Sequence, residues 1–581
     1  MTREKVLGSI IPPIDQLKFS VLVNEVLDEP ILGAFVGVNY KRNGQEGILI
    51  GKVLDFEVVN DLSEYLSLAK GIQSFASNEQ VQRIVERKSA LILKCQVVSA
   101  LSSETGNRVP YDAPIRPFAP AFRIDEKELN KLLGRHRFFH IGYHYGGQLL
   151  HHLYLQEFKE LDEAYHFVLA GLSGSGKSTL AKLLLVGYAR HRELGFFILD
   201  TAGEFARAFR DQDKSRFSLP MASLWKKLRR EKPQVLGLND LSLTTWNLLQ
   251  ELLIEEKVFE PLRIKHAENQ RRASDHLVAS LRGKKVTLGD LPNRLSEVKA
   301  VLMKEDFLKA TYSDKQRREE VANAIESTEL WGEFQRRFKK VASYFLKDRP
   351  TPEGLVKRLK QTPGNTVVLD LSTLEWESRL KYLLIREVVK QLYRIGMESY
   401  RHTGKATFNT LVVVEEAHRL VPPASWAGEN DELAETRKTL LRALAETRKA
   451  GLGWMLISTR LGNLDRRVFD EARIKILGRG LSTGEDADRI RASFGREVLT
   501  YYSGLPDPSD PLSNRRQHVF MISGPITVLS KRTPEFVEIF DRPEKFFREN
   551  GLEHAESDKS DPTSGSAQGV EELPDEDDLP F

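Results

Sequence analysis

Short apolar runs rich in strand-forming residues dominate the first 112 residues of the chain. Four of these runs are expected to be strands, with turn residues such as Asn43-Gly44 and Gly106-Asn107 between them, at residues 19–23, 34–40, 47–53 and 90–101. This pattern predicts a small barrel or sandwich. Prolines 110, 114, 117 and 120 predict an extended connector after it, because proline lacks the N–H of a helix and restricts the residue before it.

From residue 165 the pattern changes to an apolar strand, a glycine-rich loop, a helix and a second apolar strand, which together form a βαβ unit ending at residue 200. Later apolar runs of the same kind are found at residues 366–371, 410–416, 453–459, 473–479 and 518–523. A strand whose two faces are both apolar must be buried on both sides. These runs therefore predict a parallel sheet between layers of helices.

The stretch between the second and third of these strands has a different character. Residues 206–365 are rich in Leu, Lys, Arg and Glu at helical spacing and show little strand signal. We therefore expect a helical subdomain inserted into the α/β domain.

Composition narrows the class of protein. The chain has 581 residues, 41% hydrophobic and 29% charged, and no window approaches the roughly 18 uninterrupted apolar residues of a membrane helix. No secretory signal is visible, and the single cysteine, Cys95, excludes an intrachain disulfide and a cysteine-based zinc cluster. We expect a cytoplasmic protein that does not contact a membrane.

Charge is distributed unevenly along the chain. The formal net charge is +4, but residues 553–581 hold ten acids and one lysine, so the rest of the chain carries +13. A disordered acidic tail and a basic body are expected, and a basic body suits a polyanionic partner.

The glycine-rich loop carries the clearest chemistry. Residues 171–178 read Gly-Leu-Ser-Gly-Ser-Gly-Lys-Ser, which fits G-x-x-x-x-G-K-[ST] between a strand and a helix. Lys177 would reach the β and γ phosphates of a nucleotide, and the Ser178 hydroxyl would bind Mg²⁺. The expected phosphate-binding residues are Gly171, Ser173, Gly174, Ser175, Gly176, Lys177, Ser178 and Thr179. The alternative is a flexible Gly/Ser turn.

Two adjacent carboxylates end the apolar run at 411–414. Successive strand residues point to opposite faces, so Glu415 and Glu416 need distinct roles. We assign Glu415 to the metal and Glu416 to the attacking water. The alternative is that two acids merely end a strand at the surface.

In this order, these motifs resemble the HerA branch of the HerA/FtsK superfamily of P-loop motor ATPases. The residues at 200–205, Asp-Thr-Ala-Gly-Glu-Phe, are similar to the family's D-P-H-G-E-Y, and those at 446–451, Glu-Thr-Arg-Lys-Ala-Gly, are similar to E-G-R-K-F-G. The resemblance implies an α/β fold, with a RecA-like P-loop ATPase core, an N-terminal β-barrel and an inserted helical subdomain. It also implies ATP and Mg²⁺ as cofactors and a homohexameric ring with the ATP sites between subunits.

The resemblance also assigns catalytic residues. It implies that Arg448, with Lys449 beside it, reaches the γ-phosphate of a neighbouring subunit as an arginine finger; without the family, Arg448 would be a cation at a helix C-terminus. Asp200 and Glu204 could orient the attacking water or a basic partner, or instead cap the next helix. Thr459 stands where the family has glutamine, which affects how the γ-phosphate is sensed.

Five segments follow from these motifs. They are residues 1–122 (N-terminal β-barrel and proline-rich connector), 123–205 (linker and first part of the ATPase core), 206–365 (inserted helical subdomain), 366–552 (second part of the core and C-terminal extension) and 553–581 (disordered acidic tail).

The function expected is a ring-forming, ATP-dependent translocase or helicase on double-stranded DNA. The resemblance implies a partner such as a NurA-like nuclease or another effector, in DNA end processing or repair or in antiviral (anti-phage) defence. The alternative is an ATP-dependent ring scaffold that assembles and activates a partner effector with little translocation.

Three weaker features remain. His144, His151 and His152 resemble a metal site, but no carboxylate or cysteine has matching spacing nearby, so they are expected to be structural. Basic clusters such as the one at 336–340 are expected on solvated helix faces, with phosphate contact as the alternative. The last residues look like the acidic tip of bacterial single-stranded-DNA-binding proteins, so Phe581 could enter a partner's pocket.

Overall fold

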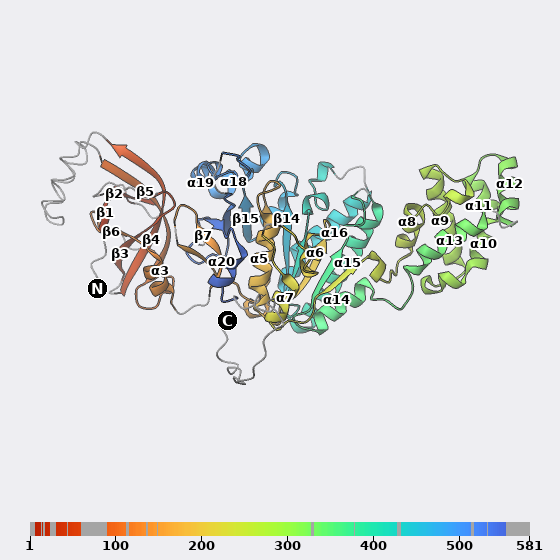
Figure 1. The fold of residues 1–581 in the computed structure, drawn as a ribbon, viewed down its shortest axis with the longest axis horizontal. Helices are drawn as coiled ribbons and strands as arrows, with labels where there is room; N and C mark the ends of the chain where they lie inside the picture. The colour runs from red at the N-terminus through yellow and green to blue at the C-terminus, as the bar shows by residue number, and fades with distance from the viewer. Residues whose placement is uncertain are drawn as a thin grey trace, which may run out of the picture.

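The computed structural model separates the chain into three regions along its longest axis, with a strand-rich region at one end, a large sheet in the middle and a group of helices at the other end (Figure 1). It describes residues 6–12, 14, 18–23, 31–42, 45–59, 90–111, 115–134, 138–147, 149–215, 217–326, 330–376, 378–426, 431–512, 516–530 and 533–552. The predicted turn at Asn43-Gly44 and the acidic tail from residue 553 lie outside these residues.

The N-terminal region is a closed antiparallel barrel, as predicted, with the strand order β1-β2-β5-β4-β3-β6. Its strands are β1 (Val6–Ile11), β2 (Lys18–Val23), β3 (Phe35–Arg42), β4 (Gln45–Val59), β5 (Ala90–Ser102) and β6 (Pro120–Arg123). The prediction missed β1 and β6. Pro120, which we placed in the connector, begins β6, because a proline that opens a strand removes no interior hydrogen bond of the ladder.

The middle region contains an 11-stranded sheet in the order β11-β12-β10-β13-β14-β9-β15-β16-β17-β7-β8. The strands are β7 (Phe139–His144), β8 (Leu150–Leu153), β9 (Phe167–Ala170), β10 (Gly195–Asp200), β11 (Gln234–Gly237), β12 (Thr366–Asp370), β13 (Thr410–Val414), β14 (Leu452–Ser458), β15 (Ile474–Gly478), β16 (Val519–Ser523) and β17 (Glu535–Ile539).

The prediction of a parallel sheet is right for one part of this sheet and wrong for the other. From β11 to β15 neighbouring strands run parallel, but β16 pairs antiparallel with β15, and β17, β7 and β8 continue in antiparallel pairs. An apolar run shows only that both faces are covered, and it contains no information about strand direction.

Helices cover both faces of the sheet, as the apolar runs predict. Along β10, Phe196 and Ile198 pack into one core and Phe197 and Leu199 into the other. The helices of the middle region, with the helix that follows the barrel, are α3 (Glu126–Leu133), α4 (Phe158–Leu161), α5 (Lys177–Ala189), α6 (Glu204–Phe209), α7 (Met221–Lys227), α14 (Pro352–Gln361), α15 (Arg379–Thr403), α16 (Asp431–Thr447), α17 (Arg466–Glu471), α18 (Gly484–Phe494), α19 (Arg496–Ser503) and α20 (Pro543–Glu549).

A group of helices lies at the far end of the molecule, between β11 and β12 in sequence (Figure 1). It consists of α8 (Trp246–Glu255), α9 (Ala267–Gly283), α10 (Leu295–Leu302), α11 (Glu305–Thr311), α12 (Lys315–Glu326) and α13 (Trp331–Ser343). The range 206–365 also contains elements of the central layer, because β11 pairs with β12, and α14 packs on β10 and β12.

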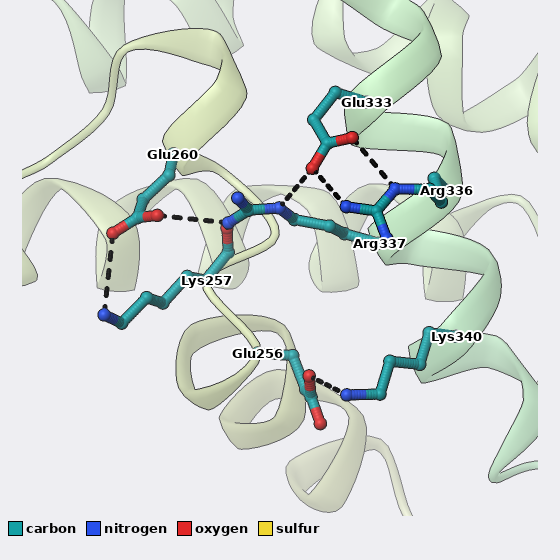
Figure 2. A network of polar contacts seen from close by, with 7 residues as sticks. All are labelled: Glu256, Lys257, Glu260, Glu333, Arg336, Arg337 and Lys340. Atoms are coloured by element: carbon teal, nitrogen blue, oxygen red, sulfur yellow. Dashed lines mark hydrogen bonds and ion pairs between the residues drawn. The ribbon is translucent and has the colours of Figure 1, made fainter.

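The basic cluster of α13 forms ion pairs within this helical group (Figure 2). Glu333 accepts hydrogen bonds from Arg336 (2.7 Å) and Arg337 (3.0 Å), and Lys340 pairs with Glu256 at the end of α8 (2.6 Å). These cations are therefore balanced by carboxylates, and they join α13 to the segment around α8.

Within the described residues, no helix combines the length and the apolar character that a membrane crossing requires.

Candidate nucleotide site

The glycine-rich loop joins the buried strand β9 to helix α5, in the setting that the motif predicts. Gly174 (φ 80°) and Gly176 (φ 93°) adopt left-handed backbone angles that other residues rarely take. Gly176 is the residue that caps the N-terminus of α5, where free backbone N–H groups favour an anion.

Lys177 is the first residue of α5 and lies under this loop. Its side chain is largely buried, and its Nζ donates a hydrogen bond to the carbonyl oxygen of Leu172 (3.1 Å). Burial lowers the pKa of Lys177, while the carboxylate of Glu416 raises it. The ammonium therefore lies inside the loop and close to negative charge.

A cavity of about 420 Å³ opens in front of the loop. Most of the predicted phosphate-binding residues line it, namely Ser173, Gly174, Gly176, Lys177, Ser178 and Thr179. Gly171 and Ser175 do not, and they shape the loop instead, since the Gly171 N–H donates to Ser458 (3.3 Å) and the Ser175 N–H to Leu172 (3.1 Å).

The predicted carboxylates come to the same cavity from neighbouring strands. Glu204, Glu415, Glu416 and Thr459 line it, and they follow the ends of β10, β13 and β14. These strands are parallel neighbours, so their carboxyl ends meet at one edge of the sheet, where ligand sites of α/β folds lie.

Asp200 and Glu415 form a buried pair behind this edge. Both oxygens of Asp200 accept backbone hydrogen bonds, from Gly203 (2.8 Å) and Ala206 (2.6 Å) at the start of α6. Glu415 accepts one from Ala202 (3.0 Å), and burial together with the neighbouring Asp200 raises the pKa of Glu415. Asp200 does not line the cavity; its contacts are those of the helix cap that the sequence left open as its alternative role.

Glu416 has a different environment from Glu415. It is held in the left-handed region (φ 50°), which is unusual for a residue other than glycine and turns the side chain away from the strand direction. Its carboxylate is half-buried and lies 3.4 Å from His418 Nε2. Burial raises its pKa and the nearby Lys177 lowers it. The two acids therefore have different surroundings, but strand alternation is not the reason, because β13 ends at Val414 and Glu416 lies in a left-handed turn.

Arg448 and Lys449 lie at the opposite edge of the sheet, which is formed by the amino ends of its parallel strands. They form a short turn between α16 and β14, before the first residue of that strand, whereas Thr459 follows its last. The seven residues of β14 put about 20 Å between these two edges. Arg448 pairs loosely with Glu163 (3.7 Å), and Lys449 lies 5.3 Å from the ring centre of Tyr400. Neither residue lines the cavity of its own chain.

Sequence reasoning missed one wall of the cavity. Residues from the antiparallel part of the sheet and from the loop after α6 complete it: Ser215, Phe217, Arg516, His518, Ile539, Phe540 and Asp541. His518 contacts the phosphate-binding loop, since its Nδ1 is 3.2 Å from the carbonyl oxygen of Ser175. The available signal was an Arg-x-His sequence directly before an apolar strand, but that pattern has no known spacing to the loop motif.

The middle of the chain is similar to a known protein family. Residues 161–392 match the family model described as Helicase HerA, central domain. This segment is similar to the HerA central domain. The match contains the phosphate-binding loop, Asp200 and Glu204, and it confirms the predicted resemblance over this range, which is less than half of the chain.

Solved structures give similarities that are weak in sequence. VirB4 of Thermoanaerobacter pseudethanolicus has 16% identity over 70% of this chain and 98% of its own, with a TM-score of 0.33. The bacterial conjugative coupling protein TrwBΔN70 has 12% identity over 72% and 92%, with a TM-score of 0.36. The genome packaging NTPase B204 of Sulfolobus turreted icosahedral virus 2 has 10% identity over 65% and 98%, with a TM-score of 0.27. No curated protein matches the chain.

Proposed function

We propose that this protein is an ATPase that drives translocation on double-stranded DNA and works as a ring of identical subunits. The observation that carries the proposal is the separation of two groups of residues at opposite edges of one sheet. A phosphate-binding loop with two carboxylates lies at the carboxyl edge of the sheet, and an arginine and a lysine lie at the opposite edge.

The carboxyl edge supplies the groups for nucleotide binding and hydrolysis. The N–H groups of the loop and the Lys177 ammonium bind the β and γ phosphates, and Glu416 accepts the proton of the attacking water. Glu204, which also lines the cavity, helps to orient that water.

Magnesium fits the donor atoms of this edge. Ser178 and Glu415 line one cavity and offer the hydroxyl and carboxylate oxygens that Mg²⁺ prefers, so these two residues would hold the ion. Bound there, the ion would neutralise charge on the phosphates.

The amino edge explains why the enzyme would need a neighbour. Arg448 cannot reach a nucleotide that lies about 20 Å away on the far edge of its own sheet. In a closed ring with head-to-tail interfaces, the amino edge of one subunit faces the carboxyl edge of the next, and Arg448 then approaches the γ-phosphate of that neighbour. Lys449 adds a second positive charge at the same interface.

We propose that the basic part of the chain, before residue 553, binds duplex DNA, which is a polyanion. The sequence before residue 553 carries a formal charge of +13, and Arg401, His402 and Lys405 are exposed at the end of α15. Such cations bind phosphates without reading sequence, and each neutralised phosphate releases a counterion. The NurA-like nuclease or other effector, the role of Phe581 and a cytoplasmic location stay predictions.

Phosphate release tests the proposal directly. We expect linear duplex DNA to stimulate ATP hydrolysis several-fold, with a stimulation that weakens as salt rises, and we expect ATP to be required for displacing a third strand from a triplex. Glu416→Gln is the control, because it should bind DNA and ATP without displacing the strand. Turnover that ignores DNA, together with no displacement, would favour the ATP-dependent scaffold.

A further inference from the structure

A cluster of buried polar side chains lies at the junction of the barrel and the central sheet, away from the nucleotide cavity. His144 ends β7, His151 lies in β8, and Glu535 begins β17. In the sequence the two histidines are 384 or more residues from Glu535, so the missing carboxylate of the histidine motif is supplied by the fold.

The strand register brings the three side chains to one face. His144 pairs with Val537, and Glu535 lies two residues from Val537, so both side chains emerge on the same side of the sheet. Tyr143 pairs with Leu150, so the residues that follow them, His144 and His151, share that side as well. One ligand atom from each of the three residues lies within 4.8 Å of the other two.

All three side chains are buried, and their hydrogen bonds are incomplete. His151 Nε2 is 2.7 Å from a Glu535 oxygen, but His151 Nδ1 and both ring nitrogens of His144 have no hydrogen-bond partner among the described residues. Buried polar atoms nearly always have a partner, because an unsatisfied one loses its contact with water and gains nothing. A group that accepts electron pairs from imidazole nitrogens would supply what is missing.

We propose that His144, His151 and Glu535 bind one zinc ion that holds the β7–β8 hairpin against β17. Imidazole nitrogens and a carboxylate oxygen are a ligand set that zinc uses, whereas Mg²⁺ and Ca²⁺ prefer oxygen ligands alone. The second Glu535 oxygen accepts a hydrogen bond from the Ser530 N–H (2.8 Å), which fixes the orientation of the carboxylate. Three protein ligands leave the fourth position of a tetrahedral zinc ion to a water molecule.

Lys52 of the barrel offers a competing explanation for the buried negative charge. It is buried between aromatic rings, with Nζ 4.8 Å from the ring centre of Phe536 and 5.7 Å from that of Tyr501. If its ammonium balances Glu535, no metal is needed. An experiment must therefore distinguish a zinc ion from the Lys52 ammonium as the positive charge that balances Glu535.

The site has a consequence for the nucleotide cavity. β17 begins at Glu535 and ends at Ile539, which lines the cavity together with Phe540 and Asp541. A zinc ion at the start of this strand would fix one wall of the nucleotide site relative to the β7–β8 hairpin.

Metal content of the full-length protein tests the proposal. The protein is purified with a tag that contains no histidine, and its zinc is measured by inductively coupled plasma mass spectrometry. We expect about one zinc ion per chain in the wild type, and a loss of at least fivefold in His144→Gln and Glu535→Gln. The matched control is His152→Gln, next to His151 in β8. The His152 ring nitrogens contact Leu150 and Asn130 instead (2.8 and 3.3 Å), so this variant should keep its zinc.

Two further measurements test the proposal even if a variant of a proposed zinc ligand fails to fold. Chelator-treated wild type should melt at a lower temperature and recover on addition of Zn²⁺, and Lys52→Met, which removes the ammonium but keeps the apolar stem, should retain both zinc and stability. Folded wild type with less than about a tenth of a zinc per chain and no uptake of added Zn²⁺ would overturn the proposal, as would zinc that His144→Gln retains. Loss of folding in a zinc-free Lys52→Met protein would assign the charge balance to Lys52 instead.

Discussion

The two edges of the central sheet carry different parts of one proposed reaction. The carboxyl edge holds a loop, an ammonium and carboxylates around a shared cavity, and these are the groups that we propose bind the nucleotide. The amino edge presents Arg448 and Lys449, which lie too far from the cavity of their own chain to contact a nucleotide bound there. Under the proposed function, nucleotide binding is a property of the single chain, whereas full catalysis needs two chains in contact.

Removing the cation of the amino edge should have the largest effect. Arg448→Ala should lower kcat by roughly 10³- to 10⁵-fold, because an arginine finger stabilises charge on the transferred phosphoryl group. Mixing it with Glu416→Gln subunits should restore part of the activity, since some interfaces then join an intact Arg448 to an intact Glu416. Phosphate release by the two variants, alone and mixed, measures this.

Arg473→Ala is the matched control for Arg448→Ala, because Arg473 pairs with the same Glu163 and has similar exposure. It should keep nearly the wild-type rate. A fully active Arg448→Ala protein, or a monomer with full activity in light scattering, would refute the shared site.

Removing the proposed base of the carboxyl edge should have the next largest effect. Glu416→Gln should reduce hydrolysis by about 10²- to 10⁴-fold while it keeps ATP affinity, because the amide cannot accept the proton of water. Lys177→Ala should instead lose nucleotide binding, since Lys177 holds the phosphates. Isothermal titration separates the two effects, and full-rate hydrolysis by Glu416→Gln would contradict the assignment.

A residue that only the tertiary structure places in the cavity should have a moderate effect. Arg516→Ala should raise the KM for ATP about tenfold, the loss expected when a charged contact to an anion is removed. Arg542→Ala is its control, because Arg542 is exposed and does not line the cavity. An unchanged KM in Arg516→Ala would remove the antiparallel wall from the nucleotide site.

The ion pair at the amino edge should matter least. Glu163 contacts Arg448 at 3.7 Å and is partly exposed, so Glu163→Gln should change the free energy of unfolding by less than about 1 kcal/mol and turnover by less than about threefold. Denaturant unfolding and phosphate release measure the two quantities. A loss of turnover as large as that of Arg448→Ala would mean that Glu163 positions the finger in the ring.

Local chemistry explains which features could be predicted from the residues alone. The loop at 171–178 needs only its own glycines and the strand and helix beside it, so its motif predicts both its conformation and its place at the sheet edge. The place of Glu415 and Glu416 at the carboxyl end of a strand was predictable for the same reason. The left-handed turn at Glu416, which separates their surroundings, was not. The apolar runs likewise determined that the sheet is covered on both faces.

Contacts between distant segments were decided only by the tertiary structure. Strand direction in β16 and β17 depends on how the chain returns to the sheet, which no local pattern encodes, and that return brings Arg516 and His518 to the phosphate-binding loop. The partnership of His151 with Glu535 arises from strand register across 384 positions. A hydrophobic period or a sequence motif describes one segment and its near neighbours. Strand register and strand direction are set by the packing of the whole sheet.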